Sequence, residues 1–218
     1  MAAMALLFTV SCEENEDENT PGAEDIKGSR IVDADDDTWT LKITDNEFNV
    51  NSFPIEGNYT YTYTAGNIFL TREEELRVFH PSLILDGTVL ILEEVLPEDA
   101  DEYLKRNLEP IAFFKKDAKI PCTAADIKGA WHWAAFHNDD DPRIKITIDG
   151  NNIEVAIPIW RTINKGTFTY SNGYINMNVN ADLSTGQPFE GTKKFPFVVN
   201  GDKGYGVLAN LPGLYKKQ

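Results

Sequence analysis

The sequence has few of the residues on which metal sites, nucleophilic catalysis and disulfide frameworks depend. Only two of its 218 residues are cysteine and three are histidine. Two cysteines do not make a disulfide framework, although one bond between Cys12 and Cys122 is possible. The histidines His80, His132 and His137 show no His-x-x-x-His spacing, and the chain has no Gly-x-Ser-x-Gly motif. We therefore expect a protein that is not an enzyme and that holds no cofactor.

Positive charge is also scarce. The chain has 20 lysine and arginine residues against 35 aspartate and glutamate residues, which gives a formal net charge of −15. Nucleic-acid binding depends on clustered basic residues, and a field of this sign repels a phosphate backbone. The composition thus argues against nucleic acid as a partner, and against the head-group plane of an anionic membrane.

Long apolar runs are missing as well. Met1–Val10 is apolar, but it is much shorter than the roughly 20 residues that span a bilayer. It ends just before Cys12 and an acidic tract, and so resembles a bacterial lipoprotein signal followed by the surface-export signal of Bacteroidetes lipoproteins. This resemblance implies a signal peptide with a lipidated cysteine over 1–12, a disordered acidic tether over 13–23, and a lipid-anchored protein at the outer membrane or cell surface. The alternative is a free cysteine in a disordered tail.

The remaining chain contains an internal repeat. Asp25–Ile31 and Asp126–Trp133 both begin Asp-Ile-Lys-Gly, and each opens a segment of roughly a hundred residues. Similar pieces then follow in the same order, which is stronger evidence than one matching tetrapeptide. We predict a first β-domain over 24–120 and a second over 121–218. The matched pieces include Gly57–Tyr61 with Gly166–Tyr170, and Asn67–Leu70 with Tyr174–Met177.

Each repeat consists mainly of short strand-like pieces. Trp39–Thr44 alternates apolar and polar residues, and Tyr59–Tyr63 places three tyrosines on one face and two threonines on the other. Asp149 and Gly150 form a tight hairpin signal. The pattern predicts an all-β protein of two tandem antiparallel meanders, closed into small barrels or folded as β-sandwiches.

One piece of the first repeat reads as a helix. Pro97 suits a first helical position, and acidic residues follow it. Lys105 and Arg106 suit the other end, and Pro110 ends the pattern. We predict a short inserted helix near 97–108.

The second repeat resembles a known family. Gly129-Ala130-Trp131 is similar to the Gly-x-Trp signature of lipocalins, and the order of strands is similar to the lipocalin-like domains of Bacteroidetes lipoproteins. The resemblance implies small barrels in which Trp131 packs across the closed end. In the first repeat Arg30 occupies the tryptophan position.

Aromatic residues of the second repeat form the candidate ligand site. Trp131 and Trp133 share one face of a strand, Trp160 and Tyr170 lie on later strands, and Arg161 suggests a polar boundary. Such residues can line a pocket or stack on sugar rings, and they can equally form the core. We expect them to bind a small apolar or amphipathic ligand or a glycan.

Acidic residues offer only a partial metal motif. Asp33, Asp35 and Asp37 alternate as calcium ligands can. The glycine and glutamate of an EF-hand are replaced by Thr38 and Thr44. We expect a solvated turn and no metal.

A rival function is a structural or interaction module in a cell-surface complex with another envelope protein. A carrier needs a partly unfilled interior, whereas an interaction module is packed solid.

Overall fold

The computed structural model describes residues 20–34, 37–52, 55–73, 75–100, 109–133, 144–183, 191–208 and 211–218. Within these ranges the chain forms two closed antiparallel barrels of eight strands each. Barrel 1 contains β1 (Gly28–Ala34), β2 (Asp37–Ile43), β3 (Phe48–Ser52), β4 (Ile55–Thr64), β5 (Asn67–Arg72), β6 (Glu75–Ile84), β7 (Val89–Glu94) and β8 (Ile111–Lys115). Barrel 2 contains β9 (Gly129–Trp133), β10 (Lys145–Asp149), β11 (Asn152–Ile157), β12 (Thr162–Ser171), β13 (Tyr174–Asp182), β14 (Thr192–Asn200), β15 (Lys203–Leu208) and β16 (Leu211–Lys217).

The prediction of an all-β protein with two tandem antiparallel meanders is confirmed, and the meanders close into barrels rather than sandwiches. Of the helix predicted near 97–108, Pro97–Ala100 form a turn in which Ala100 N donates to Pro97 O at 3.0 Å. Residues 101–108 lie outside the described ranges. No helix in the described part of the chain is both long and apolar enough to cross a membrane.

Strand pairing gives the equivalence between the two repeats. Arg30 lies between Leu41 and Lys115. Trp131 lies in the same way between Ile146 and Lys217. Arg30 therefore occupies the position of Trp131, as the sequence predicts.

The predicted match of Gly57–Tyr61 with Gly166–Tyr170 is wrong by two residues. Tyr170 faces Ile175 in barrel 2, as Tyr63 faces Ile68 in barrel 1, so Tyr170 corresponds to Tyr63 and not to Tyr61. The cause is loop length. The β3–β4 hairpin has two residues between its last pair, whereas the β11–β12 hairpin has four, including the 3₁₀ helix η1 (Pro158–Trp160).

Both barrels are filled by large side chains. Barrel 1 contains four large aromatic side chains that are at most 2 % exposed, namely Trp39, Phe48, Phe79 and Phe113. In barrel 2, Trp131, Phe197 and Tyr215 form edge-to-face pairs with ring centroids 5.5 and 5.4 Å apart, a favoured aromatic geometry. The described interiors are thus packed with protein side chains.

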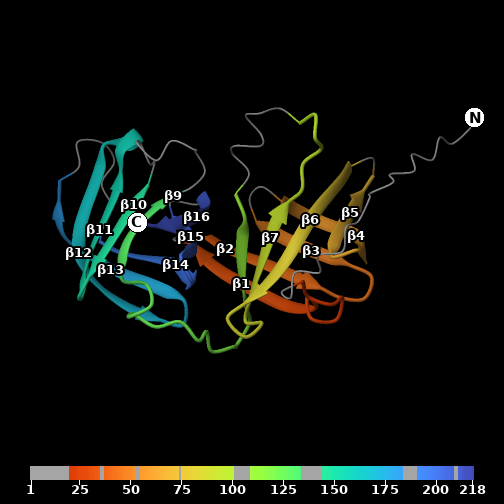
Figure 1. Cartoon of the computed structure of the whole chain (residues 1–218), viewed down its shortest axis with the longest axis horizontal. Coiled ribbons are helices and arrows are strands. Elements are labelled where there is room, and N and C mark those ends of the chain that lie inside the picture. Colours follow the sequence, from red (N-terminus) through yellow and green to blue (C-terminus); the bar gives the residue numbers. More distant parts are fainter. Residues whose placement is uncertain are drawn as a thin grey trace, which may run out of the picture.

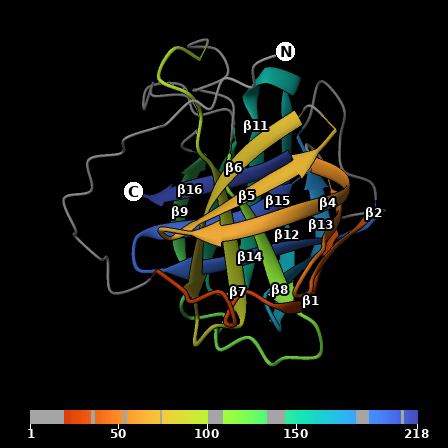
Figure 2. The same ribbon diagram turned by 90° about the vertical axis from the view of Figure 1, so that its right-hand side faces the viewer.

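The barrels lie side by side along the long axis of the molecule (Figure 1), and barrel 1 covers barrel 2 when the view is turned by 90° (Figure 2). Four strands show where they meet. The first four residues of β7 and of β8 are all buried, as are 195–199 of β14 and 204–208 of β15. Alternate residues of a strand point to opposite faces, so these strands are covered on both sides. One face packs on its own core and the other on the neighbouring barrel, where Phe114 meets Tyr174 edge to face at 5.3 Å.

Candidate functional site

In each barrel the first and last strands pair with each other over a few residues and then separate. We call this place the seam of the barrel. In barrel 1, β1 and β8 pair at Arg30 with Lys115 and at Ile31 with Phe114, and Lys116 N donates to Ser29 O at 3.0 Å. β1 continues beyond these pairs, and the backbone N–H of Asp33 donates to the hydroxyl of Tyr174 in barrel 2 at 3.1 Å. A buried backbone N–H without an acceptor is unfavourable, and the Tyr174 hydroxyl supplies the acceptor here. Barrel 2 therefore completes the seam of barrel 1.

At the seam of barrel 2, the hydrogen-bond acceptor comes from barrel 1. The β9–β16 ladder ends at Trp133 and Tyr215. The next residue, Leu214, donates its N–H to Oε2 of Glu109 in barrel 1 at 2.8 Å. The Trp133 side chain also interacts with the Glu109 carboxylate. The two seams hold the barrels in one arrangement, which fixes the shape of any pocket between them.

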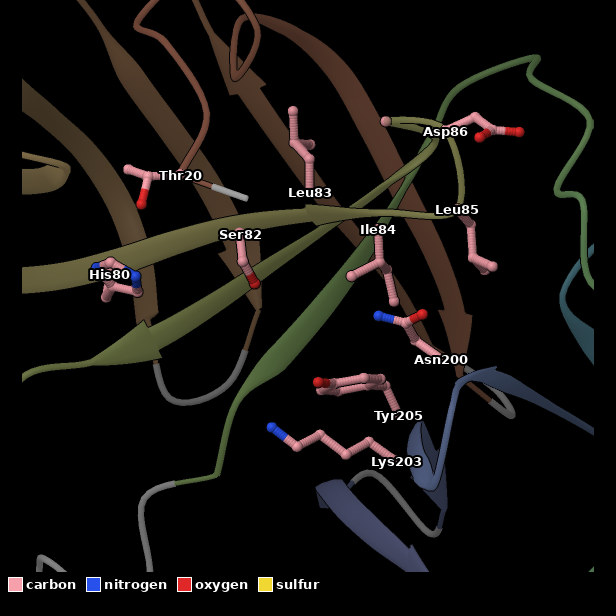
Figure 3. Close-up of a pocket in the computed structure, with 11 residues that line it drawn as sticks. Thr20, His80, Ser82, Leu83, Ile84, Leu85, Asp86, Asn200, Lys203 and Tyr205 are labelled. Carbon is pink, nitrogen blue, oxygen red and sulfur yellow. The ribbon is translucent and has the colours of Figure 1, made fainter. Parts of the chain in front are cut away.

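A pocket of about 570 Å³ lies at the edge of this contact, and we call it the inter-barrel pocket (Figure 3). Its walls come from both barrels and from the segment that precedes β1. The lining residues are Thr20, His80, Ser82, Leu83, Ile84, Leu85, Asp86, Gly87, Asn200, Lys203 and Tyr205.

Strand geometry explains which side chains reach the pocket. On β6, His80, Ser82 and Ile84 are two residues apart and share the outer face of barrel 1. On barrel 2, Lys203 and Tyr205 share the outer face of β15. Figure 3 shows the Lys203 ammonium and the Tyr205 ring extending into the space below β6.

The polar groups of the pocket are available for a ligand. Among the described residues, no side-chain hydrogen bond joins Asn200, Lys203 or Tyr205 to the protein, whereas His80 Nδ1 lies 3.4 Å from Oδ1 of Asn67. Burial, together with the negative charges of Glu93 and Asp202, raises the pKa of Tyr205. The Tyr205 hydroxyl therefore stays protonated at neutral pH and can both donate and accept.

The lining charges of the pocket balance. Lys203 contributes one positive charge and Asp86 one negative charge. The remaining polar groups are hydroxyls and an amide, which combine donors and acceptors. Such a surface suits an uncharged, hydrogen-bonding ligand.

A second, smaller pocket of about 340 Å³ lies beside the other edge of the contact. Two of its charged groups already pair with each other. Lys194 Nζ is 2.8 Å from Oδ2 of Asp33 and 4.3 Å from the centre of the Tyr174 ring. This pocket is therefore better described as part of the contact that holds the barrels together.

The aromatic residues singled out from the sequence do not line either pocket. Trp131 is fully buried and its indole donates to Ile127 O at 2.8 Å. The Tyr170 hydroxyl donates to Phe197 O at 2.8 Å. Both belong to the core of barrel 2.

The other three residues of that set lie elsewhere in barrel 2. Trp133 is half-buried at the seam, where its side chain interacts with Glu109. Trp160 is 39 % exposed, and Arg161 is exposed in a left-handed conformation with φ of 53°. The structure does not gather the five predicted residues into one site.

The aspartates considered as calcium ligands interact with protein groups instead. Asp33 forms the ion pair with Lys194, and Asp37 accepts from Thr38 N at 2.9 Å and from the Trp39 indole at 3.3 Å. Asp35 lies outside the described residues. The described part of the chain contains no group of three or more His, Cys, Asp or Glu side chains placed to hold a metal ion.

Cys12 and the acidic tract behind it also lie outside the described residues, so the lipid anchor stays a prediction. Cys122 is a buried free thiol. It lies beside the Tyr170 hydroxyl, whose pKa is raised by burial first and by Cys122 second.

Sequence reasoning missed the inter-barrel pocket, although one signal for the contact was present. Val89–Leu92, Ile111–Phe114 and Phe195–Val199 are continuous apolar runs rather than alternating ones. Such runs are typical of strands covered on both faces. The pocket residues His80 and Lys203 belong to no pattern that marks them in the sequence.

Comparison of the chain with protein-family models, with curated proteins and with solved structures gave no match in any of the three. Its function is therefore inferred from the geometry of the pocket and the chemistry of its walls.

Proposed function

We propose that the chain is a non-catalytic, lipid-anchored envelope protein that binds a glycan in the inter-barrel pocket. The observation that carries this proposal is the pocket itself, whose polar side chains come from two barrels held in a fixed arrangement by their seams. Cys12 attaches the chain to the membrane of the outer envelope or cell surface, as its lipoprotein-like sequence suggests.

The chemistry of the pocket favours a glycan over a purely apolar molecule. The barrel interiors are occupied by side chains such as Trp39 and Trp131. By contrast, Ser82, Asn200 and Tyr205 offer hydroxyl and amide groups in the pocket. Sugar hydroxyls are both donors and acceptors and match such groups, while the sugar C–H faces suit the aliphatic part of the wall.

Titration calorimetry with a panel of neutral oligosaccharides tests this proposal. The protein is the full chain carrying Cys12→Ala, which we expect to be soluble because the lipid is absent. Asn200→Ala and Lys203→Gln should each weaken binding about tenfold, the effect of losing roughly 1.4 kcal/mol of hydrogen bonding. Lys128→Gln is the control, because Lys128 is an exposed lysine that precedes β9 and does not line the pocket. Failure of every oligosaccharide to bind, or equal affinities in all variants, would contradict the proposal.

A second candidate function is a protein-interaction module. Trp160 and Leu183 are 39 % and 56 % exposed on barrel 2, and Leu183 N donates to Ile163 O at 2.9 Å, close to Trp160 in the chain. Exposed apolar groups of this kind favour contact with another envelope protein. This function replaces the first if no oligosaccharide of the panel binds and if Trp160→Ala abolishes the capture of one defined partner by the protein.

A further inference from the structure

We infer that the glycan bound in the inter-barrel pocket is the headgroup of a glycolipid in the membrane to which the chain is anchored. This inference rests on the proposed function and names the ligand class of the same pocket. Three observations support it: the position of the N-terminal segment, the apolar surface beside the pocket, and the charge of the pocket.

The segment that leads to the anchor starts at the pocket. Thr20 is one of the lining residues (Figure 3), and its methyl group lies against Gly66 of the β4–β5 hairpin. The Tyr63 hydroxyl donates to Pro21 O. These contacts fix the start of the described chain to barrel 1 at the pocket rim.

Chain length then limits how far the pocket can be from the membrane. Thr20 is eight residues after Cys12. Eight residues span at most about 29 Å, whatever their conformation. A lipid on Cys12 therefore keeps the pocket rim within about 29 Å of the membrane surface, so membrane-borne headgroups are concentrated around it.

An apolar surface continues from the pocket along β6. Beyond His80, the outer face of the strand carries Val78 and then Leu76, which is 62 % exposed. Val95 is 47 % exposed and lies beside Val78, because its N–H donates to Val78 O at 2.8 Å. Leu76 is about 13 Å along the strand from His80. A polar pocket next to exposed apolar side chains suits an amphipathic ligand, with its sugar in the pocket and the base of its acyl chains against this surface.

Charge indicates which glycolipids fit. Lys203 and Asp86 contribute opposite charges to the pocket wall, Glu93 and Asp202 add negative charge near Tyr205, and the chain carries a net charge of −15. The field of the whole protein disfavours anionic lipids. The ligand class is therefore a neutral glycolipid.

Vesicle co-sedimentation tests the inference with the full chain carrying Cys12→Ala. The vesicles are pure phosphatidylcholine, or phosphatidylcholine with a minor fraction of digalactosyldiacylglycerol or monoglucosyldiacylglycerol. We expect binding only to vesicles with a glycolipid, with an affinity at least tenfold higher than for the free headgroup sugar. Lys203→Gln and Leu76→Ser should each lower vesicle binding at least tenfold. Leu183→Ser and Lys128→Gln are matched controls, since both residues are exposed, belong to the second repeat and lie outside the pocket.

The other outcomes separate the two proposals. Binding of free oligosaccharides without binding to glycolipid vesicles overturns the inference and leaves the proposed function intact. Equal binding to pure phosphatidylcholine, or vesicle binding that Leu76→Ser does not change, also overturns the inference. If neither free oligosaccharides nor glycolipid vesicles bind, both proposals fail.

Discussion

Arg30 shows how one residue distinguishes the two repeats. It occupies the position at which barrel 2 has Trp131, and it is 3 % exposed. Its Nη2 donates to Asp25 O at 3.3 Å, while Nε and Nη1 have no partner among the described residues. Burial lowers the Arg30 pKa to about 10, which still leaves the guanidinium charged at neutral pH. Because a buried charge without a counter-charge is unfavourable, Arg30 costs barrel 1 stability.

We predict that Arg30→Met stabilises the protein. The substitution removes the desolvated charge and keeps an apolar side chain of similar length, so the free energy of unfolding should rise by about 1–4 kcal/mol. Urea denaturation measures the change, and Arg161→Met, at an exposed position, should have almost no effect. A loss of stability in Arg30→Met would show that the guanidinium has a stabilising role.

A second residue couples stability to pH. Burial raises the pKa of Glu109 to about 7, and the charge of Glu93 adds to the effect, whereas hydrogen bonds from Leu214 N and the Trp133 side chain oppose it. The folded pKa lies above the unfolded value of 4.5. The protonated form therefore favours folding, and stability from this group is lost as pH rises from about 4.5 to 7.

Glu109→Gln should remove this dependence, because the amide is neutral at every pH and still accepts from Leu214 N. Relative to the parent protein, the variant should gain about 2–3 kcal/mol in free energy of unfolding between pH 4.5 and pH 8. Urea titrations of both proteins across this range provide the measurement. A difference between the two that does not change with pH would refute the assignment.

At the scale of elements, alternation of apolar and polar residues predicted most of the strands. Trp39–Thr44 corresponds to β2 and Tyr59–Tyr63 lies within β4. Between these two strands the chain forms β3, which ends at Ser52, and β4 begins at Ile55. Alternation is a local property, so it located strands but did not give hairpin lengths. The sequence match between the repeats was therefore wrong by two residues after the longer β11–β12 loop.

A β-bulge in β13, opposite Lys165 and Gly166 of β12, is another feature that alternation does not reveal. The pairing of β12 with β13 shifts register between Lys165 and Gly166. A Cβ atom at Gly166 would lie 2.0 Å from the carbonyl oxygen of Asn178, which is backbone and cannot move aside easily. The glycine is therefore required by a close backbone approach.

Gly166→Ala should destabilise barrel 2 by about 1–3 kcal/mol, the usual cost of overpacking. Thr167→Ala is the matched control, because the Thr167 side chain is exposed on the same strand. Thermal and urea denaturation compare the two variants. Equal stabilities would mean that the bulge relaxes without cost.

At the scale of the whole molecule, the candidate site depends on residues from both repeats. His80 and Ser82 belong to barrel 1, whereas Asn200 and Lys203 belong to barrel 2. The sequence indicated two barrels and aromatic candidates within one of them, but reasoning within a single repeat cannot reveal a pocket formed by docking. In the sequence, only the continuous apolar runs of β7, β8 and β14 indicated this contact.

The reciprocal seams predict that the barrels stabilise each other. Expressed alone, 20–120 loses the Tyr174 hydroxyl that accepts from Asp33 N, and 121–218 loses the Glu109 carboxylate that accepts from Leu214 N. Each half also exposes the apolar outer face of its docking strands. We expect both halves to unfold at lower urea concentrations than the full chain, and to regain stability when mixed. Unchanged unfolding midpoints for the separate halves would contradict this mutual dependence.

The contact between the barrels uses partly equivalent strands, since β7 of barrel 1 corresponds to β15 of barrel 2. Strand pairing makes His80 and Ser82 of barrel 1 equivalent to Pro196 and Val198 of barrel 2. The face that barrel 2 uses for docking is thus the face that barrel 1 presents to the pocket. Pro196 and Val198 are buried in barrel 2, whereas His80 and Ser82 are only partly buried in barrel 1. Histidine and serine in place of proline and valine therefore leave a polar hollow at one edge of an otherwise apolar contact.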